Sequence, residues 1–215
     1  MTALLPPLRL TGATILRDGE LQQRSLVIEH GRISKGPRPE VDMSGYLILP
    51  GIIDLHGDAF ERHIAPRPSA PFPIASGLRS TDRDAAVHGI TTAWLAQCWS
   101  WEDGMRGPDF AEEVMQAMEL YRPLSLTDLR VQLRCETHMP ETRARMLAAV
   151  RRYGIDYVVF NNHLPEMLDI AQTAPHRLRA WAERSGSTDD AFRQRLSDAN
   201  ARNREVPRHL CALAE

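Results

Sequence analysis

Lysine is almost absent from this sequence, and that shortage excludes several kinds of chemistry. Lysine and arginine together number 26, yet the only lysine is Lys35. No lysine after residue 35 can therefore serve as a P-loop lysine, a Schiff base or a carbamylated metal bridge. Anions bound by the later part of the chain must be held by arginine, by a metal ion or by the backbone. A GC-rich coding sequence would produce the same arginine bias without any functional cause.

Cysteine and long apolar stretches are scarce as well. Cys98, Cys135 and Cys211 are widely spaced and odd in number, which indicates reduced thiols rather than a disulfide framework. The first residues lack the positive charge and apolar run of a secretory signal. The longest apolar stretch, residues 46–55, is interrupted by proline, glycine and aspartate and is too short for a membrane span. We therefore expect a cytoplasmic protein that does not enter a membrane.

The remaining composition is that of an ordinary globular protein. The 215 residues are 43% hydrophobic and 25% charged, which is enough chain and enough apolar surface for a buried core. The formal net charge of −2 provides no basic field to attract a nucleic-acid backbone. Nucleic acid is therefore not an expected partner.

The hydrophobic pattern changes near residue 48. Residues 8–34 alternate in short runs, with turns at 18–19 and 30–31, and predict a small antiparallel β module. After residue 48, apolar strands alternate with helical stripes, which predicts parallel β-α units followed by a polar helical region with a helix start at 187–190. The expected strands are 52–55, 90–96, 130–136 and 155–160, and the expected helices between them are 81–88, 109–121 and 141–153.

Four parallel strands are compatible with two folds. They form either an open doubly wound sheet or half of a (β/α)₈ barrel, which takes about 250 residues when complete. A half-barrel leaves two unpaired sheet edges.

The first expected strand ends in a pair of candidate metal ligands. His56 and Asp58 stand two residues apart after a Pro-Gly break and an apolar strand. In an extended chain such residues point to the same face, so both side chains can meet one cation. The carboxyl ends of parallel strands are also where sites of barrels and open sheets lie. An isolated H-x-D pair is nevertheless more often a polar strand end without a ligand.

Several blocks of the sequence resemble the amidohydrolase superfamily. LPGIIDLHGD at 49–58, preceded by a small β module, is similar to the first barrel strand of that superfamily. AFERH and APRP within 59–68 resemble, within it, the diphosphatase family that acts on α-D-ribose 1-methylphosphonate 5-triphosphate in the carbon–phosphorus lyase pathway. Later blocks of that family are matched in order by GITT at 89–92, LRCE at 133–136 and FNNHLP at 160–165.

The resemblance implies a fold and its division. We expect an α/β chain in which residues 1–48 are the N-terminal portion of a β-sandwich. Residues 49–215 would form an incomplete TIM-type (β/α) barrel of about four β-α units. In the family, the chain continues into a fifth strand with a Ser-His-Asp-Asp block and later an aspartate, and this sequence has neither. A truncated form is therefore expected, with the catalytic base beyond it.

The resemblance also implies a divalent-metal site for one or two ions, with zinc the expected metal. Its ligands would be His56, Asp58, Glu136 and His163. A carboxylate must replace the usual carbamylated lysine, and Glu136 at a strand end can do so. The alternatives are that Glu136 pairs with a neighbouring arginine, Arg134 or Arg130, and that His163 is a polar residue without a metal.

Substrate binding is implied for Arg62, Arg67 and Asn162. Arginine forks match phosphate oxygens, and Arg67 lies between Pro66 and Pro68. A solvated surface arginine is the alternative for Arg67. Asn162 stands where the family usually has aspartate, and an amide cannot act as a carboxylate base.

The implied reaction is metal-assisted hydrolysis of the triphosphate to the 5-phosphate and diphosphate. Two alternatives stay open. The chain is a catalytically inactive half-barrel that self-associates or binds a partner through its open edges, or it is another amidohydrolase, such as a deacetylase of phosphorylated amino sugars.

Overall fold

The computed structural model describes residues 5–67 and 71–214 and divides into two compact units, Met1–Ile52 and Ile53–Glu215. The expected boundary between residues 48 and 49 lies close to this division. Residues 1–4 lie outside the described part, and they include the start of the segment in which no secretory signal was expected. Pro68 of the APRP block also lies outside it.

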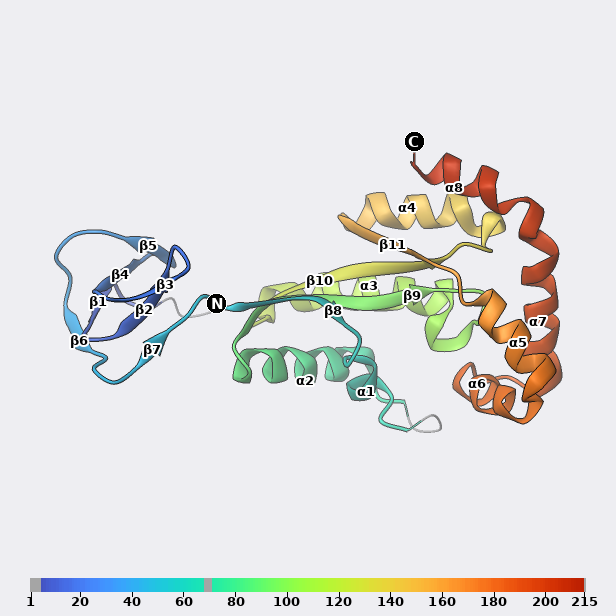
Figure 1. The fold of residues 1–215 in the computed structure, drawn as a ribbon, viewed down its shortest axis with the longest axis horizontal. Coiled ribbons are helices and arrows are strands. Elements are labelled where there is room, and N and C mark those ends of the chain that lie inside the picture. The colour runs from blue at the N-terminus through green and yellow to red at the C-terminus, as the bar shows by residue number, and fades with distance from the viewer. Residues whose placement is uncertain (1–4, 68–70, 215) are drawn as a thin grey trace. The chain divides into compact units, whose positions relative to one another are not determined.

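The first unit consists of two small sheets (Figure 1). One has the order β5-β4-β1-β6 and the other the order β3-β2-β7. Asp18–Gly19 and His30–Gly31 close the β2–β3 and β4–β5 hairpins with positive φ at all four residues, as a type I′ turn requires. The antiparallel pairs expected in 8–34 are thus present, while their place in a β-sandwich stays a prediction. The strands are β1 (Leu8–Thr11), β2 (Thr14–Arg17), β3 (Glu20–Gln23), β4 (Leu26–Glu29), β5 (Arg32–Ser34), β6 (Glu40–Asp42) and β7 (Leu47–Ile48).

The second unit is built on a four-stranded sheet with the order β11-β10-β9-β8. β9, β10 and β11 are parallel neighbours. The α/β class is therefore confirmed, and half of a barrel stays a prediction for this sheet. Its strands and the helices between them are β8 (Ile52–Gly57), α1 (Glu61–Ile64), α2 (Ile74–Val87), β9 (Ile90–Trp99), α3 (Pro108–Tyr121), β10 (Asp128–Glu136), α4 (Arg143–Tyr153) and β11 (Tyr157–Asn161).

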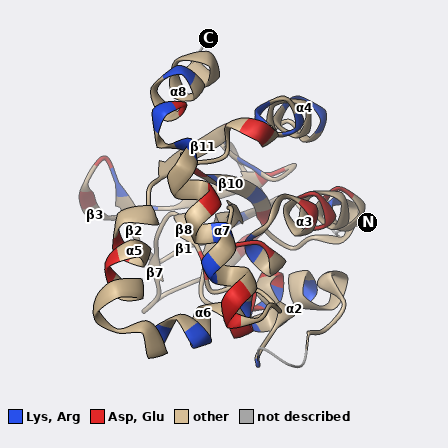
Figure 2. Cartoon of the chain, turned by 90° about the vertical axis from the view of Figure 1, so that its right-hand side faces the viewer, with Lys and Arg blue, Asp and Glu red and all other residues tan. Residues whose placement is uncertain are grey.

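The helices follow the apolar spacing of the sequence. On α3, Ala111, Val114, Met115 and Met118 are buried at intervals of three and four residues, which places one face of the helix on the core. The helix expected at 81–88 is wrong in its start, because α2 begins directly after Pro73 and also buries Leu78. In Figure 2, basic positions are coloured on α4 and acidic positions on α3, and Arg145 of α4 forms ion pairs with Asp109 at 2.7 Å and Glu112 at 2.9 Å of α3.

A helical region follows β11. Thr188 caps α7 by accepting a hydrogen bond from the Ala191 N–H at 3.2 Å, as the expected helix start required. Phe192 on α7 is fully buried, and its ring lies 6.0 Å from that of Trp101, which follows β9. The helices are α5 (Leu164–Thr173), α6 (Leu178–Arg184), α7 (Asp189–Ala201) and α8 (Val206–Ala214), and the 3₁₀ turns of the unit are η1 (Gly104–Arg106), η2 (Arg122–Leu124), η3 (Pro140–Thr142), η4 (Pro175–Arg177) and η5 (Arg202–Arg204). In the described residues, every helix is too short or too polar to cross a bilayer.

One buried carboxylate ties α2 to the start of β10. Asp82 is fully buried and accepts hydrogen bonds from the Tyr121 hydroxyl at 2.8 Å and from the Leu126 N–H at 2.7 Å. The N–H and hydroxyl of Thr127 donate two more, at 2.9 and 2.6 Å. Burial alone would raise the pKa of Asp82, but these donors outweigh burial and lower it.

We expect Asp82→Asn to lower the free energy of unfolding by about 2–3 kcal/mol at neutral pH, because an amide leaves buried donors unsatisfied. A carboxyl with a lowered folded pKa stabilises the protein above its unfolded pKa, and that contribution disappears as the pH falls through the folded value. The difference from the wild type should therefore shrink below about pH 4.

Urea unfolding followed by tryptophan fluorescence measures this change in the second unit alone, since all four tryptophans lie after residue 53. Asp84→Asn, at an exposed position of the same helix, is the control and should change stability by no more than about 0.5 kcal/mol. Equal stability of the two variants would contradict the role given to Asp82.

Candidate functional site

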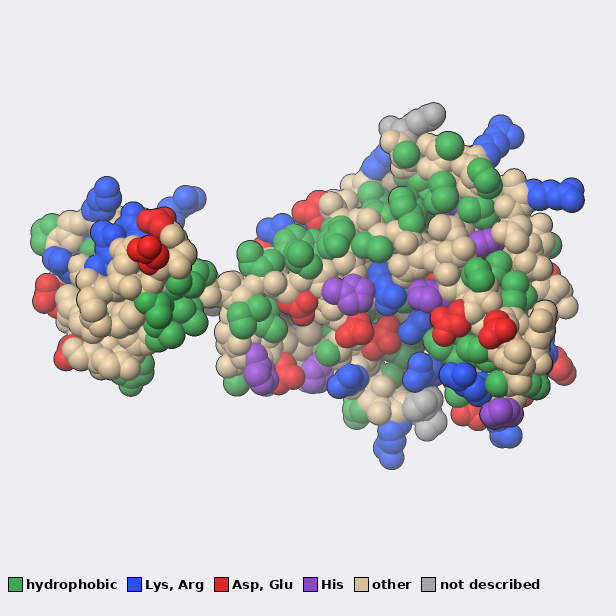
Figure 3. All heavy atoms as spheres, viewed as in Figure 1, with side chains coloured by type: hydrophobic (Ala, Val, Ile, Leu, Met, Phe, Trp, Pro, Cys, Tyr) green, Lys and Arg blue, Asp and Glu red, His purple; other side chains and the backbone are tan. Residues whose placement is uncertain are grey.

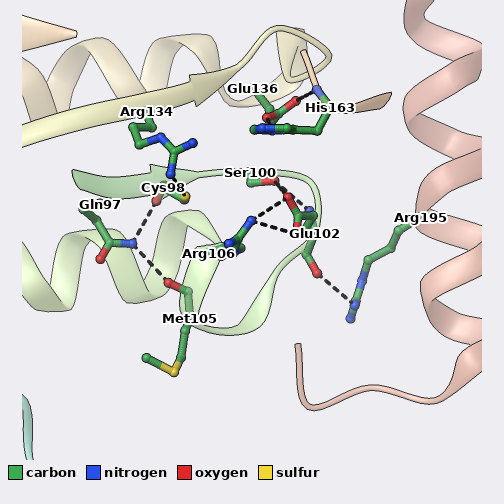
Figure 4. Close-up of polar contacts among 10 residues, drawn as sticks. All are labelled: Gln97, Cys98, Ser100, Glu102, Met105, Arg106, Arg134, Glu136, His163 and Arg195. Carbon is green, nitrogen blue, oxygen red and sulfur yellow. Dashed lines mark hydrogen bonds and ion pairs between the residues drawn. The ribbon is translucent and has the colours of Figure 1, made fainter. Parts of the chain in front are cut away.

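The C-terminal ends of three neighbouring strands bring two carboxylates and an imidazole together. Glu102 follows β9, Glu136 ends β10 and His163 follows β11. One ligand atom from each lies within 4.8 Å of the others. Both glutamates are 3% exposed, while the imidazole is half-buried. Figure 4 shows the three side chains on adjacent segments. We call this set the Glu–Glu–His group.

The pairing of β10 with β11 positions two of these residues. Glu136 is in register with Asn161, so the chain reaches His163 just beyond the strand end. The His163 N–H donates to Glu136 Oε2 at 3.1 Å, and the imidazole Nδ1 is hydrogen-bonded to Glu136 Oε1. These two contacts fix the orientation of the ring. Of the two alternative partners for Glu136, Arg130 pairs instead with Asp128 at 2.7 Å.

Glu102 belongs to a tight turn after β9. Its N–H donates to Ser100 Oγ at 3.1 Å, and the Ser100 hydroxyl donates to Glu102 Oε1 at 3.3 Å. Arg106 donates to both carboxylate oxygens at 3.3 Å. Asp103 has a φ of 68°, and this left-handed residue folds the chain back into η1. The turn therefore holds the carboxylate before any ligand binds.

Sequence reasoning missed Glu102. The available signal was its position, because it follows the second expected strand as Asp58 follows the first. Acidic residues after parallel strands meet at one sheet edge. The sequence blocks that indicated the other residues do not include position 102.

The Glu–Glu–His group fits a divalent cation. Carboxylate oxygen and imidazole nitrogen are ligands of zinc and related metals. Two buried carboxylates at this separation repel each other, and a cation between them offsets that repulsion. Burial raises the pKa of the neighbouring Cys98 thiol to about 11.

The other two expected metal ligands lie on β8 and the turn after it. His56 Nδ1 lies 2.6 Å from Gln132 Oε1, and the Gln132 amide donates to Leu55 O at 2.7 Å. Since that amide oxygen only accepts, Nδ1 carries the proton and Nε2 is the acceptor atom of a neutral ring. Asp58 is exposed and lines a neighbouring pocket. Within the described residues the metal-type group contains neither side chain, and metal binding by His56 and Asp58 stays a prediction.

The expected substrate-binding residues occupy different positions. Arg62, on α1, lines the same pocket as Asp58. Arg67 is exposed at the end of the described segment, and its neighbour Pro68 lies outside it. Asn162 is exposed between β11 and α5. The roles of these three residues stay predictions.

Comparison with known proteins agrees with the resemblance seen in the sequence. No family model matches the chain. The class indicated is the amidohydrolase superfamily, and the resemblance is confirmed by a curated relative. That relative is the α-D-ribose 1-methylphosphonate 5-triphosphate diphosphatase of Escherichia coli (strain K12), with 28% identity over 172 residues. The match covers 76% of this chain and 46% of the relative, so the chain spans about half the length of that protein.

Two solved structures are similar in part. A D-hydantoinase from Bacillus sp. AR9 aligns with a TM-score of 0.43 and 15% identity, over 70% of this chain and 32% of the hydantoinase. An uncharacterised protein aligns with a TM-score of 0.28 and 13% identity, over 91% of this chain and 76% of that one.

We expect Glu102→Gln and Glu136→Gln each to weaken Zn²⁺ binding by at least about tenfold, the smallest loss seen for outer-shell partners of metal sites. The physical reason is that an amide neither carries the charge nor matches the donor strength of a carboxylate. Isothermal titration of the chelator-treated chain with Zn²⁺ measures the affinity.

Glu113→Gln, at an exposed position of α3, is the matched control and should bind Zn²⁺ as the wild type does. Wild-type Zn²⁺ affinity in both the Glu102 and Glu136 variants would contradict metal binding by the Glu–Glu–His group.

Proposed function

We propose that this chain carries part of a metal-dependent hydrolase of phosphonate catabolism. The reaction would be hydrolysis of α-D-ribose 1-methylphosphonate 5-triphosphate to the 5-phosphate and diphosphate. The observation that carries the proposal is the Glu–Glu–His group at the C-terminal ends of parallel strands. The similarity to the diphosphatase supports the choice of substrate.

The residues of the site divide into metal ligands and anion donors. Glu102, Glu136 and His163 would hold a divalent cation, and zinc suits this donor set. When bound, such a cation polarises a phosphoryl oxygen and lowers the pKa of water. His56 and Asp58 remain proposed ligands of the same centre. The hydrogen bond between His163 and Glu136 keeps the imidazole oriented.

The proposal also assigns the residues that bind the anionic substrate and the cellular location of the enzyme. Arg62 and Arg67 would donate to phosphate or phosphonate oxygens, and Asn162 would donate its amide to the substrate. The three cysteines are free thiols, which supports placing the enzyme in the cytoplasm.

The purified chain, loaded with Zn²⁺, tests the proposal by release of diphosphate from the ribose methylphosphonate triphosphate. We expect release that a chelator abolishes and that Glu136→Gln lowers by at least about tenfold. Glu113→Gln should retain the wild-type rate. Release of acetate from N-acetylglucosamine 6-phosphate, without release of diphosphate, would favour the amino-sugar deacetylase. A fully metal-loaded chain that is inert with both substrates would contradict hydrolytic activity of this chain by itself.

The exposed sheet edges favour self-association as a second candidate. Ile53 and Leu55 on the edge strand β8 are 62% and 54% exposed, and Phe160 on the opposite edge strand β11 is 47% exposed. Apolar edge strands are templates for pairing with another chain. This observation favours a homo-oligomer that forms through the edges of the sheet.

Sedimentation velocity at micromolar concentration should therefore detect a dimer or larger species. Leu55→Glu should shift the population to monomer, because a charge at the edge opposes pairing. Leu120→Glu, at an exposed position of α3, should leave the distribution unchanged. A wild-type chain that sediments as a clean monomer would contradict self-association.

A further inference from the structure

A pocket of about 430 Å³ lies beside the Glu–Glu–His group, and this volume is in the range of small-molecule sites. Glu102 belongs to both, since it lines the pocket and contributes to the group. Figure 3 shows acidic, basic and histidine side chains gathered on one face of the second unit. Four arginines line the pocket, namely Arg62, Arg106, Arg134 and Arg184.

Trp181 on α6 organises two of these arginines. The guanidinium carbon of Arg106 lies 5.2 Å from the centre of the indole, and that of Arg184 lies 5.4 Å from it. A guanidinium over an aromatic face is stabilised while its N–H groups remain available to a ligand. The helical region after β11 thus completes a pocket that begins at the ends of the strands.

Arg134 is held by neighbours without negative charge. With the amide of Asn161 turned so that its oxygen faces the guanidinium, Nε and one Nη each donate to it at 3.1 Å. Another Nη lies 3.9 Å from Cys98 Sγ. Positioned donors of this kind lose little conformational entropy when a ligand binds.

The arginines that line the pocket outnumber the ion pairs that they form with its carboxylates. Within the described residues, the ion pair of a pocket-lining arginine is Arg106 with Glu102. Asp103 also lines the pocket, but Arg195 from α7 pairs with it at 2.9 Å. Arg62, Arg134 and Arg184 therefore face Asp58 and Glu61 as the remaining carboxylates.

Glu61 lines the pocket together with these arginines. Burial raises the pKa of Glu61, and Asp58 raises it further, against the attraction of Arg106, Arg134 and Arg184. A negative charge on Glu61 repels an anion that enters the pocket, so removal of this charge favours anion binding.

We propose that this pocket binds an oligophosphate group, with Arg106, Arg134 and Arg184 as its donors, Trp181 as their support and Glu61 as a residue that weakens binding. The inference rests on the proposed function, since it assigns the residues that would hold the phosphate chain of the substrate. Guanidinium forks match phosphate oxygens two at a time, and a linear di- or triphosphate offers several such pairs. Because Glu102 is shared, an anion in the pocket lies next to the proposed metal ligands.

Titration of the full chain with inorganic tripolyphosphate in the presence of a chelator tests the pocket without any metal. Arg184→Gln should weaken binding by about tenfold, because a charge-assisted hydrogen bond is lost. Trp181→Leu should weaken it as well, through the loss of the guanidinium support. Glu61→Gln should strengthen binding, and this opposite sign separates an electrostatic role from general damage to the fold.

Arg179→Gln is the matched control on the same helix. Arg179 is 74% exposed and pairs with Glu183 at 3.1 Å, and it does not line the pocket. Its variant should bind tripolyphosphate as the wild type does. Equal weakening by Arg179→Gln and Arg184→Gln would show only non-specific attraction and would overturn the proposal, as would unchanged binding in Arg184→Gln.

Methylphosphonate alone provides the second arm. Tighter binding of methylphosphonate than of tripolyphosphate would overturn the assignment to an oligophosphate.

Failure of the proposed function is distinguishable from failure of the pocket. Intact tripolyphosphate binding by a metal-loaded but inert chain would contradict the hydrolase alone, and metal-dependent hydrolysis with wild-type tripolyphosphate affinity in Arg184→Gln would contradict the pocket alone.

Discussion

The parallel hydrogen bonding of β9, β10 and β11 is the constraint on which the rest of the second unit depends. Parallel strands end at the same edge of a sheet, and the register of β10 with β9 and β11 fixes how far each strand extends. The residues that follow the strands therefore converge although they are distant in sequence. Glu102, Glu136 and His163 meet for this reason, and the arginine pocket begins at the same edge.

Buried carboxylates of the second unit lie in two different environments. Asp82 is fully buried and has its acceptor capacity filled by donors from α3 and from the turn before β10, which makes it a structural anchor. Glu102 and Glu136 are also buried, but they lie near each other and are only partly compensated by Arg106 and His163. A carboxylate pair without full compensation is typical of a site that receives a cation.

The position of part of the candidate site could be predicted from the sequence, because strand ends are visible as changes of pattern. Glu136 ends the third expected strand and His163 follows the fourth, and the resemblance to amidohydrolases indicated both as ligands. Glu102 was missed, because a turn with a left-handed residue at Asp103 separates it from the regular pattern of its strand. The start of α2 was also misplaced, since the helix follows Pro73 and its first turn has little apolar periodicity.

The sequence by itself determined the α/β class, the alternation of strands with helices and the resemblance to amidohydrolases, because periodicity and short motifs are local properties. It also determined that anion binding after residue 35 cannot use lysine. Only the tertiary structure decided that Glu102 joins Glu136 and His163, and that Trp181 and Arg184 from α6 face Arg106 and Arg134. These contacts join segments far apart in the chain, and their geometry depends on packing that no local pattern encodes.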